Sequence, residues 1–413
     1  MIRLRQNGLL TIGPTRMAKL KIGRFDEQTY LRLIRGDIQG LQASLSRAAL
    51  GALSLGYGLA VRLWDWGYEW GWLRSEVAPL PVVSVGNLTV GGTGKTPLVE
   101  WVARFYRQRG WRVVILSRGY GRTRDLQDST TYQLNDEGLV LEENLPDVPH
   151  LQGRDRLALA RLAVEELESQ VAVLDDGFQH RRLGRLLDLV VVDALNPFGY
   201  HRLLPRGLLR EPLTALRRAD VFVVSRADLV TDSEFQRIET TLRRFAGQYH
   251  MIFRTRHAPQ DLTTFDGRGT VEPLGLAVGP RVAAFCGIGN PEGFRRTLDA
   301  LGVVWADQPS EALRRYPDHH AYSRSDVEDL GRWARDLGAE LVLTTQKDQV
   351  KLRVPELAGR PLKALRIGLE FLDDPGPLMS RLDQLVPGVD LQTQSDVTPE
   401  QERLICPPTP LPP

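Results

Sequence analysis

Cysteine, lysine and long apolar runs are all scarce in this chain of 413 residues, and each shortage argues against a class of protein. The two cysteines, Cys286 and Cys406, lie far apart, and neither belongs to a cluster with metal-ligand spacing. We therefore expect no disulfide framework and no zinc site, and a reducing compartment fits. The N-terminus does not resemble a secretory signal, because its first apolar run is short and basic residues continue after it.

An excess of either charge is also missing. The net charge of +2 is too small to indicate a nucleic-acid partner, and no motif in the sequence makes a protein partner evident. Only six lysines occur, so arginine supplies nearly all of the positive charge. The apolar and charged fractions are ordinary for a soluble protein, and the length allows two or more domains with cores of their own.

The most informative segment is the glycine-rich stretch PVVSVGNLTVGGTGKTP, residues 81–97. It predicts a buried strand, a turn and then a helix, which is the layout of a phosphate-binding loop. Lys95 would reach the β- and γ-phosphates of a nucleoside triphosphate, and the Thr96 hydroxyl would bind Mg²⁺. The residues predicted to contact the nucleotide are Thr89, Val90, Gly91, Gly92, Thr93, Gly94, Lys95 and Thr96.

This loop departs from the strict pattern, which has glycine six residues before the lysine, where this chain has Thr89. Other glycines supply the flexibility, at positions 86, 91, 92 and 94. A glycine-rich strand–helix turn with an exposed lysine is the alternative interpretation. The valine-rich run before the loop and the amphipathic stretch after it favour phosphate binding.

A second apolar run, residues 171–174, ends in the carboxylates Asp175 and Asp176. An acid at the carboxyl end of a strand beside a phosphate loop is suited to hold Mg²⁺, which takes one or two carboxylates together with phosphate oxygens. The alternative is a polar turn.

Asp136 is a candidate general base, although Asn-Asp before glycine is more commonly an Asx turn. The segment Tyr316–His320 has two histidines that could support acid–base chemistry, or form a polar loop.

Strands and helices alternate from residue 81 to about 270, which indicates an α/β fold with a parallel sheet and helices on both faces. The expected strands of this part cover residues 81–85, 112–116, 171–174, 189–192 and 221–224. A smaller α/β part follows, with strands 282–285 and 341–344, helices 291–301 and 324–337, and a plausible hinge at 273–280. The predicted division is a basic and possibly disordered arm at 1–39, an aromatic-rich helical region at 40–78, domains at 79–272 and 273–386, and a proline-rich disordered tail at 387–413.

The region 40–78 combines broad helical periodicity with several tryptophans, at positions 64, 66, 70 and 72. Its uncharged run, Ala48–Val61, is too short to span a bilayer comfortably. Two interpretations are open. The helix could lie in a membrane interface with arginines beside it, or it could pack on its own domain with tryptophan as core.

Taken together, the motifs resemble the tetraacyldisaccharide 4′-kinase family over roughly residues 45 to 385. The resemblance rests on segments 84–97 and 116–122, on GRDR at 153–156 and on LDDGFQHRR at 174–182. It continues through LPRGLLREP at 204–212, GIGNP at 287–291 and Asp318-His319. The ordered set is far more specific than any one motif.

The resemblance implies a P-loop NTPase-like domain and a smaller α/β domain, with the active site in the cleft between them. It implies transfer of the γ-phosphate of ATP, with Mg²⁺, to the 4′-hydroxyl of a lipid-linked glucosamine disaccharide. Peripheral association with the cytoplasmic face of the bacterial inner membrane would follow. Asp136 and His319 match the family's acid–base dyad, and Thr96, Asp175, Asp176 and Glu211 match its metal side.

Two positions depart from the family pattern: Asn135 replaces a usual glycine, and Gln346 replaces a usual glutamate. A P-loop GTPase or metallochaperone is the alternative function, since Ser225-Arg226-Ala227-Asp228 follows a strand where GTPases read guanine. The serine and arginine make that match poor. A non-catalytic membrane-surface protein that keeps a nucleotide fold is the third possibility.

Overall fold

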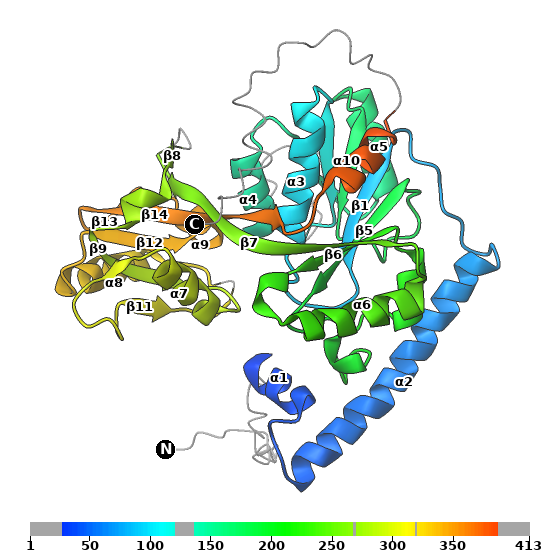
Figure 1. The fold of residues 1–413 in the computed structure, drawn as a ribbon, viewed down its shortest axis with the longest axis horizontal. Coiled ribbons are helices and arrows are strands. Elements are labelled where there is room, and N and C mark those ends of the chain that lie inside the picture. Colours follow the sequence, from blue (N-terminus) through cyan, green and yellow to red (C-terminus); the bar gives the residue numbers. More distant parts are fainter. Residues whose placement is uncertain (1–26, 120–135, 267–269, 319, 387–413) are drawn as a thin grey trace, which may run out of the picture.

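The computed structural model describes residues 27–119, 136–266, 270–318 and 320–386, which form two lobes with one long helix along the outside of the larger lobe (Figure 1). The predictions for residues 1–26, for Asn135, for His319 and for the tail from residue 387 fall outside the described residues. Residues 27–35 of the predicted arm form helix α1 (Glu27–Arg35), where the Tyr30 hydroxyl donates to the Pro205 carbonyl over 2.8 Å.

The larger lobe is built on a parallel sheet whose strands follow the order β3-β2-β4-β1-β5-β6-β7. Its strands are β1 (Val82–Asn87), β2 (Val113–Ser117), β3 (His150–Gln152), β4 (Val171–Asp175), β5 (Leu187–Asp193), β6 (Val221–Ser225) and the first part of β7 (Met251–Thr264). Strand β1 is buried along its whole length between β4 and β5, because valines cover both of its faces. The predicted parallel α/β sheet is confirmed.

Helices cover both faces of this sheet, as buried parallel strands require. They are α3 (Lys95–Gln108), α4 (Asp136–Asn144), α5 (Arg156–Glu165), α6 (Asp232–Ala246) and the short 3₁₀ helices η1 (Gly199–His201), η2 (Leu213–Arg218) and η3 (Ala227–Leu229). Val83 and Val85 of β1 pack toward α3, whereas Val82 packs toward α5. Helix α6 covers β6 on the second face.

The smaller lobe has a sheet of its own, in the order β10-β9-β12-β14. Its strands are β8 (Thr270–Glu272), β9 (Arg281–Cys286), β10 (Val304–Trp305), β11 (Leu313–Arg315), β12 (Leu341–Thr345), β13 (Glu356–Leu357) and β14 (Arg360–Phe371). Its helices are η4 (Leu274–Ala277), α7 (Pro291–Ala300), α8 (Arg324–Asp336) and α9 (Gln346–Leu352). Separate apolar clusters on its two faces contain α7 and α8.

One long strand joins the two sheets. The start of β7 pairs in parallel with β6, and its later part pairs antiparallel with β14 from Thr255 to Thr263. Figure 1 shows β7 and β14 running together between the lobes. The chain therefore crosses inside β7, before the 273–280 segment predicted as a hinge. The domain boundaries at 272/273 and 386/387 stay predictions.

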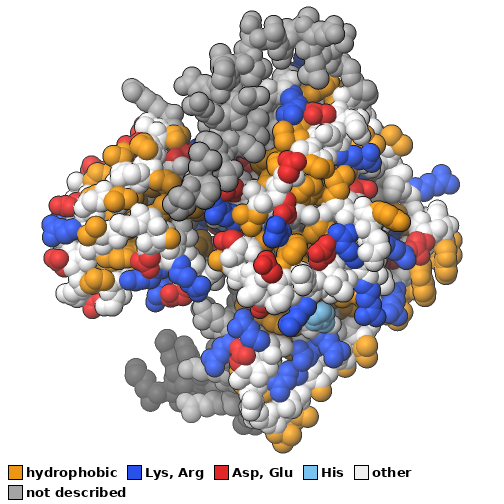
Figure 2. Space-filling view, viewed as in Figure 1, with side chains coloured by type: hydrophobic (Ala, Val, Ile, Leu, Met, Phe, Trp, Pro, Cys, Tyr) orange, Lys and Arg blue, Asp and Glu red, His pale blue; other side chains and the backbone are white. Residues whose placement is uncertain are grey.

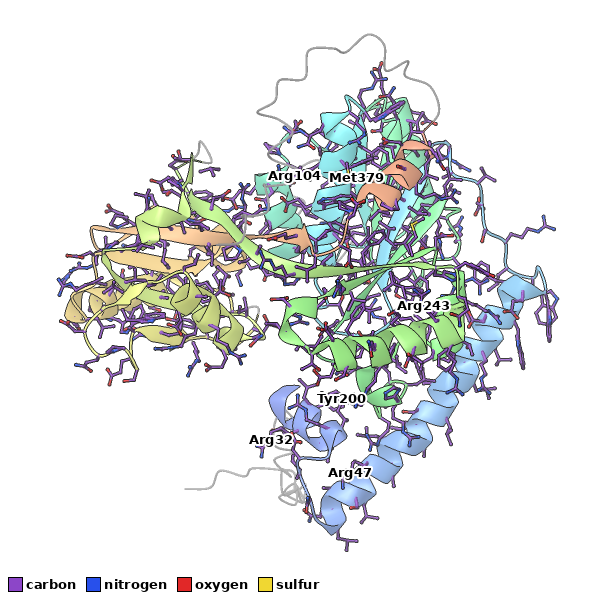
Figure 3. All side chains as sticks on the ribbon, viewed as in Figure 1. Arg32, Arg47, Arg104, Tyr200, Arg243 and Met379 are labelled. Atoms are coloured by element: carbon purple, nitrogen blue, oxygen red, sulfur yellow. The ribbon has the colours of Figure 1, made fainter. Side chains whose placement is uncertain are left out.

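The chain returns to the larger lobe after β14. Helix α10 (Gly376–Asp383) inserts Leu378 and Leu382 into the core on the α3 face. The Tyr106 hydroxyl of α3 donates to the Leu382 carbonyl over 3.0 Å. Figure 3 shows Met379 of α10 on the larger lobe, on the same side as Arg104 of α3. The lobes are thus linked by two strand connections and not by a single linker.

Helix α2 (Leu41–Glu69) is the long helix outside the larger lobe (Figure 1). Only Ala43, Gly58 and Gly67 are buried in it. Its large apolar side chains are exposed, which contradicts the interpretation of tryptophan as core. They include Leu41, Leu45, Leu53, Leu55, Leu59, Leu63, Trp64 and Trp66, with Trp70 and Trp72 just beyond the helix end. Figure 2 shows hydrophobic side chains along the edge where α2 lies.

Candidate active site

The glycine-rich loop lies between β1 and α3, as the sequence predicts, and polar side chains hold it in shape. The Asn87 side-chain amide, at the end of β1, donates to the Thr89 carbonyl over 2.7 Å and to the Thr93 hydroxyl over 2.9 Å. From β6, the Ser225 hydroxyl donates to the Thr93 carbonyl over 2.7 Å. Lys95 is the first residue of α3, where backbone N–H groups and the helix dipole favour a bound anion.

Two features explain which loop positions need glycine. Gly94 has φ of +85°, in the left-handed region, and a Cβ there would lie 2.5 Å from Nε2 of His257. Thr89 instead forms an antiparallel bridge with Leu209, and the next residue, Val90, donates its N–H to the Leu208 carbonyl over 2.8 Å. Because Thr89 pairs as a strand residue does, it does not need the conformational freedom of glycine. The departure at this position is therefore compatible with a phosphate loop.

Lys95 forms an ion pair with Asp176, which directly follows β4, the neighbour of β1 in the sheet. Its Nζ lies 3.4 Å from Oδ1 of Asp176 and 3.3 Å from Oδ1 of Asn87. Arg210 approaches Asp176 from the other side, and its Nη1 lies 2.9 Å from both carboxylate oxygens. Although burial pushes it upward, the charges of Lys95 and Arg210 hold the pKa of Asp176 below its ordinary value. Asp176 also has φ of +53°, an uncommon conformation that tends to occur at functional sites.

Asp175 precedes this residue at the end of β4, and its carboxyl is held differently. Burial raises the pKa of Asp175 to about 6; the charge of Lys95 opposes the increase, and the charges of Asp176 and Glu137 add to it. The influence of Glu137 indicates that the start of α4 lies close to the end of β4. The structure thus brings Lys95, Asp175, Asp176 and the start of α4 together at one edge of the sheet.

The donor set suits Mg²⁺ held partly by phosphate. Two adjacent carboxylates and the Thr96 hydroxyl, in the first turn of α3, lie at this edge. Across residues 27–119, 136–266, 270–318 and 320–386, no three His, Cys, Asp or Glu side chains converge as a protein-only metal cage would require. Magnesium does not need such a cage, because it retains waters and binds through one or two carboxylates plus substrate phosphates.

Glu211 is buried beside this edge, but the structure pairs it with arginine. Oε2 of Glu211 lies 2.5 Å from Nη2 of Arg218, and Asp65 of α2 lies 3.6 Å from Nη1 of the same arginine. Burial raises the pKa of Glu211, while Arg218 opposes the increase. His180, also expected near the metal, lies 3.5 Å from Nη1 of Arg156, and burial together with the surrounding arginines lowers its pKa to about 4.

Asp136 is the first residue of α4, which lies against α9 of the smaller lobe. Its Oδ2 lies 3.3 Å from Nζ of Lys351, on α9. His319 lies outside the described residues, but the residues before it are placed. A Cβ on Gly287 would lie 3.2 Å from the Pro317 carbonyl oxygen, and Asp318 lies beside Gly289. Pro317 and Asp318 therefore border the GIGNP segment after β9.

Sequence analysis missed several residues of this site. Asn87 and Arg210 lie inside the recognised motifs, but no role was predicted for either residue. Lys351 of α9, which contacts Asp136, was also missed; it is four residues from Lys347, outside the site, and that spacing on one helix face was the available signal. Thr345 caps α9, since its hydroxyl accepts from the Asp348 N–H over 3.3 Å.

The strand end after β6 does not resemble a guanine-reading site. Arg226 forms an ion pair with Asp193, and its Nη2 donates to the Gly92 carbonyl over 3.2 Å. Arg226 and Ser225 therefore both hold the backbone of the glycine-rich loop through hydrogen bonds to its carbonyls. This use of the segment removes the only sequence feature that suggested a GTPase.

No helix in the described part of the chain is both long enough and apolar enough to cross a bilayer. Helix α2 is long enough, with 29 residues, but Arg47, Arg62, Asp65 and Glu69 interrupt its apolar sequence.

Comparison with known proteins gives one family. Residues 46–387 match the family Tetraacyldisaccharide-1-P 4′-kinase. The tetraacyldisaccharide 4′-kinase of Anaeromyxobacter sp. (strain K) is 42% identical over 331 residues, which cover 76% of this chain and 84% of that protein. The one from Geobacter sulfurreducens is 37% identical over 369 residues, covering 86% and 98% respectively. The crystal structure of LpxK from Aquifex aeolicus in complex with ATP has a TM-score of 0.64 at 29% identity, covering 83% of this chain and 99% of that one.

Proposed function

This chain belongs to the tetraacyldisaccharide 4′-kinase family, and we propose how its two lobes carry out ATP-dependent phosphorylation of the 4′-hydroxyl of a tetraacyl disaccharide 1-phosphate. The product of this reaction is the 1,4′-bisphosphate precursor of lipid A. The observation that carries the proposal is the convergence of two cations on Asp176 beside the loop. Lys95 Nζ lies 3.4 Å and Arg210 Nη1 2.9 Å from its carboxylate.

In this proposal the triphosphate of ATP lies on residues 89–96, with its terminal phosphates toward Lys95. The N–H groups at the start of α3 and the ammonium of Lys95 would stabilise the charge on the transferring group. Arg210, which contacts Asp176, is close enough to add to this field. Positioning and electrostatics would supply most of the rate, because phosphoryl transfer demands little covalent chemistry from the protein.

We assign the metal site to Asp175, Asp176 and Thr96, with Glu211 beside them. These residues would hold Mg²⁺, which would supply positive charge to offset the negative charge of the phosphates. Asp176 has a pKa below its ordinary value, so its carboxylate is available as an anion. Glu211 would have to exchange its partner Arg218 for the metal, and we assign it the outer position for this reason.

Asp136, assisted by His319, is the proposed acceptor of the proton from the sugar hydroxyl. Its position supports this role, because the start of α4 lies near the end of β4 and faces the smaller lobe. Movement of the lobes about the β7–β14 connection would bring the loop that carries His319 to the phosphate loop and exclude water.

The exposed apolar face of α2 supports a further proposal, that the protein binds peripherally to the cytoplasmic face of the inner membrane. The substrate is lipid-linked, so the enzyme must meet it at a bilayer. The face of α2 toward the larger lobe is polar or small: Ser54 bonds the Leu203 carbonyl, Tyr57 bonds the Arg210 carbonyl, and Asp65 pairs with Arg181. The outward face carries the leucines and tryptophans, which suits the boundary between headgroups and acyl chains.

The transfer reaction itself is tested with radiolabelled ATP, purified protein and the tetraacyl disaccharide 1-phosphate in mixed micelles. We expect labelled 4′-phosphate with the parent and a loss of about 10²- to 10⁴-fold in kcat for Asp136→Ala. A parental rate in folded Asp136→Ala would show that another group accepts the proton. GTP in place of ATP should give little product.

Membrane binding is tested separately, by flotation with vesicles of mixed zwitterionic and anionic lipid. Leu55→Glu combined with Leu59→Glu should release the protein from vesicles, because both side chains lie on the exposed face of α2. Tyr249→Glu, a charge at a fully exposed aromatic outside α2, is the matched control and should float like the parent. Equal flotation of all three proteins would contradict the proposal.

A further inference from the structure

Helices α4 and α9 meet along a series of polar contacts that connect the two lobes. Asp136 pairs with Lys351 and Glu137 with Lys347, whose Nζ lies 2.7 Å from Oε1. About two turns further along α4, Glu143 and Asn144 accept hydrogen bonds from the side-chain amide of Gln346 over 2.9 and 2.7 Å. The candidate proton acceptor is thus the first contact of a series between the lobes.

Lys351 differs from the other lysine of α9 in its surroundings. Its side chain is 12% exposed, against 39% for Lys347, and its Nζ lies between two carboxylates. These are Oδ2 of Asp136 at 3.3 Å and Oδ1 of Asp348 at 3.5 Å. Solvent screens a buried ammonium between two carboxylates less than a surface pair, so removing one partner has a larger effect.

Asp348 in turn is fixed by the core of the smaller lobe. Its side chain is fully buried and accepts from the Gly287 N–H over 3.0 Å, from the Thr345 hydroxyl over 2.6 Å and from the Tyr322 hydroxyl over 3.0 Å. The Lys351 ammonium also lies 5.6 Å from the centre of the Tyr322 ring. The position of Lys351 is therefore set by the body of the smaller lobe and not by α4.

We propose that Lys351 is a positioning residue for phosphoryl transfer, which holds the Asp136 carboxylate in place from the smaller lobe. This inference rests on the role proposed above for Asp136. The ammonium attracts the carboxylate across the 3.3 Å between Nζ and Oδ2 and so restrains where it lies. Because Asp348 anchors Lys351, Asp136 is oriented only while α4 and α9 are in contact.

A lysine that merely joins the lobes would have the same contacts, so the test needs a matched pair. Lys347→Met removes a lysine–glutamate contact one turn away along α9, in which the α4 partner is Glu137 and not Asp136. Lys351→Met removes the contact with Asp136. We expect Lys351→Met to lower kcat by about 10- to 100-fold with the KM for ATP changed less than about threefold, whereas Lys347→Met stays within about threefold of the parent.

A double-mutant cycle shows whether Lys351 acts through Asp136. In the Asp136→Asn background, adding Lys351→Met should lower kcat by less than about twofold, because its partner has already lost its charge. Lys351→Arg, which keeps the cation, should recover part of the loss. Effects that multiply in the double variant would overturn the inference, as would parental kcat in Lys351→Met.

Removing Lys351 alone leaves Asp348 buried with one partner fewer, so folding must be followed by thermal unfolding. If Lys351→Met does not fold, Lys351→Met with Asp348→Asn removes the two opposite charges together. That folded variant should show the same loss of kcat, and parental kcat would overturn the inference. A parental rate in Asp136→Asn would contradict the proposed function instead, so the two failures are distinguishable.

Discussion

The two lobes contribute to the site in different ways. In the larger lobe, the proposed phosphate loop is built from backbone: a strand, a turn with Gly94 at φ +85° and a helix start. In the smaller lobe, side chains of α9 contact α4, and one of them, Lys351, lies 3.3 Å from the proposed proton acceptor Asp136. A site made from backbone leaves a glycine pattern in the sequence, whereas a site made from ion pairs between distant elements leaves almost none.

Lys95→Ala tests the larger lobe's half of this comparison and should have the largest effect. Removing a charge preorganised for the transferring phosphate should lower kcat by about 10³-fold. Arg107→Ala is the control, because Arg107 lies in the same helix and pairs with an aspartate, Asp147, at the surface. Steady-state kinetics with both substrates is the measurement, and equal rates in the two variants would remove Lys95 from the mechanism.

Lowering the pH should next reduce the stability of the protein at the proposed phosphate loop. His257, on β7, lies against Gly94 of this loop. Burial and the nearby Arg226 lower the pKa of His257 to about 4, whereas an unfolded histidine titrates near 6.5. The unfolded state therefore binds more protons between these values, so this stabilising contribution is complete above pH 6.5 and is lost as the pH falls toward 4.

The loss attributable to His257 is at most about 3 kcal/mol. Urea unfolding of the parent and of His257→Gln between pH 7 and 4 measures it. The variant should show the shallower dependence of unfolding free energy on pH. Identical slopes would mean that His257 is not buried as a neutral side chain.

Gly94→Ala tests how strongly the loop depends on its backbone. A Cβ at this position would be strained at positive φ and would lie 2.5 Å from Nε2 of His257, so we expect a loss of about 1–3 kcal/mol in unfolding free energy. Gly92→Ala in the same loop is the control, because a Cβ there meets nothing within 4 Å. Thermal unfolding without nucleotide compares them, and equal melting temperatures would contradict the strained geometry.

Gln346→Glu tests the α4–α9 contact and should have the smallest effect. The new carboxylate would face Glu143 and lose the hydrogen bonds that the amide donates, which should cost about 1–2 kcal/mol. Adding Glu143→Gln should restore most of the stability, because an amide donor again faces a carboxylate. Thermal unfolding of both variants measures this, and an unchanged melting temperature in Gln346→Glu would show that the contact contributes little.

Local sequence patterns were sufficient for much of the larger lobe. Strands β1, β2, β4, β5 and β6 begin within two residues of their predicted starts, because runs of valine between helices have few alternatives in a parallel sheet. Helices α7 and α8 likewise match their predicted ranges to within one residue. The long strands β7 and β14 were not predicted, since their sequences mix charged and apolar residues without a strict period.

By itself, the sequence determined the class of fold, the strand–turn–helix around residues 89–96 and the family, because these depend on residue types at fixed local spacing. It left open whether the aromatic helix is core or surface, and only the tertiary structure decided that its leucines and tryptophans point outward. Tertiary structure also decided that Arg210 meets Asp176 and that Lys351 meets Asp136. Such pairs join residues 34 and 215 positions apart, and their energy depends on distances that only the folded sheets and helices set.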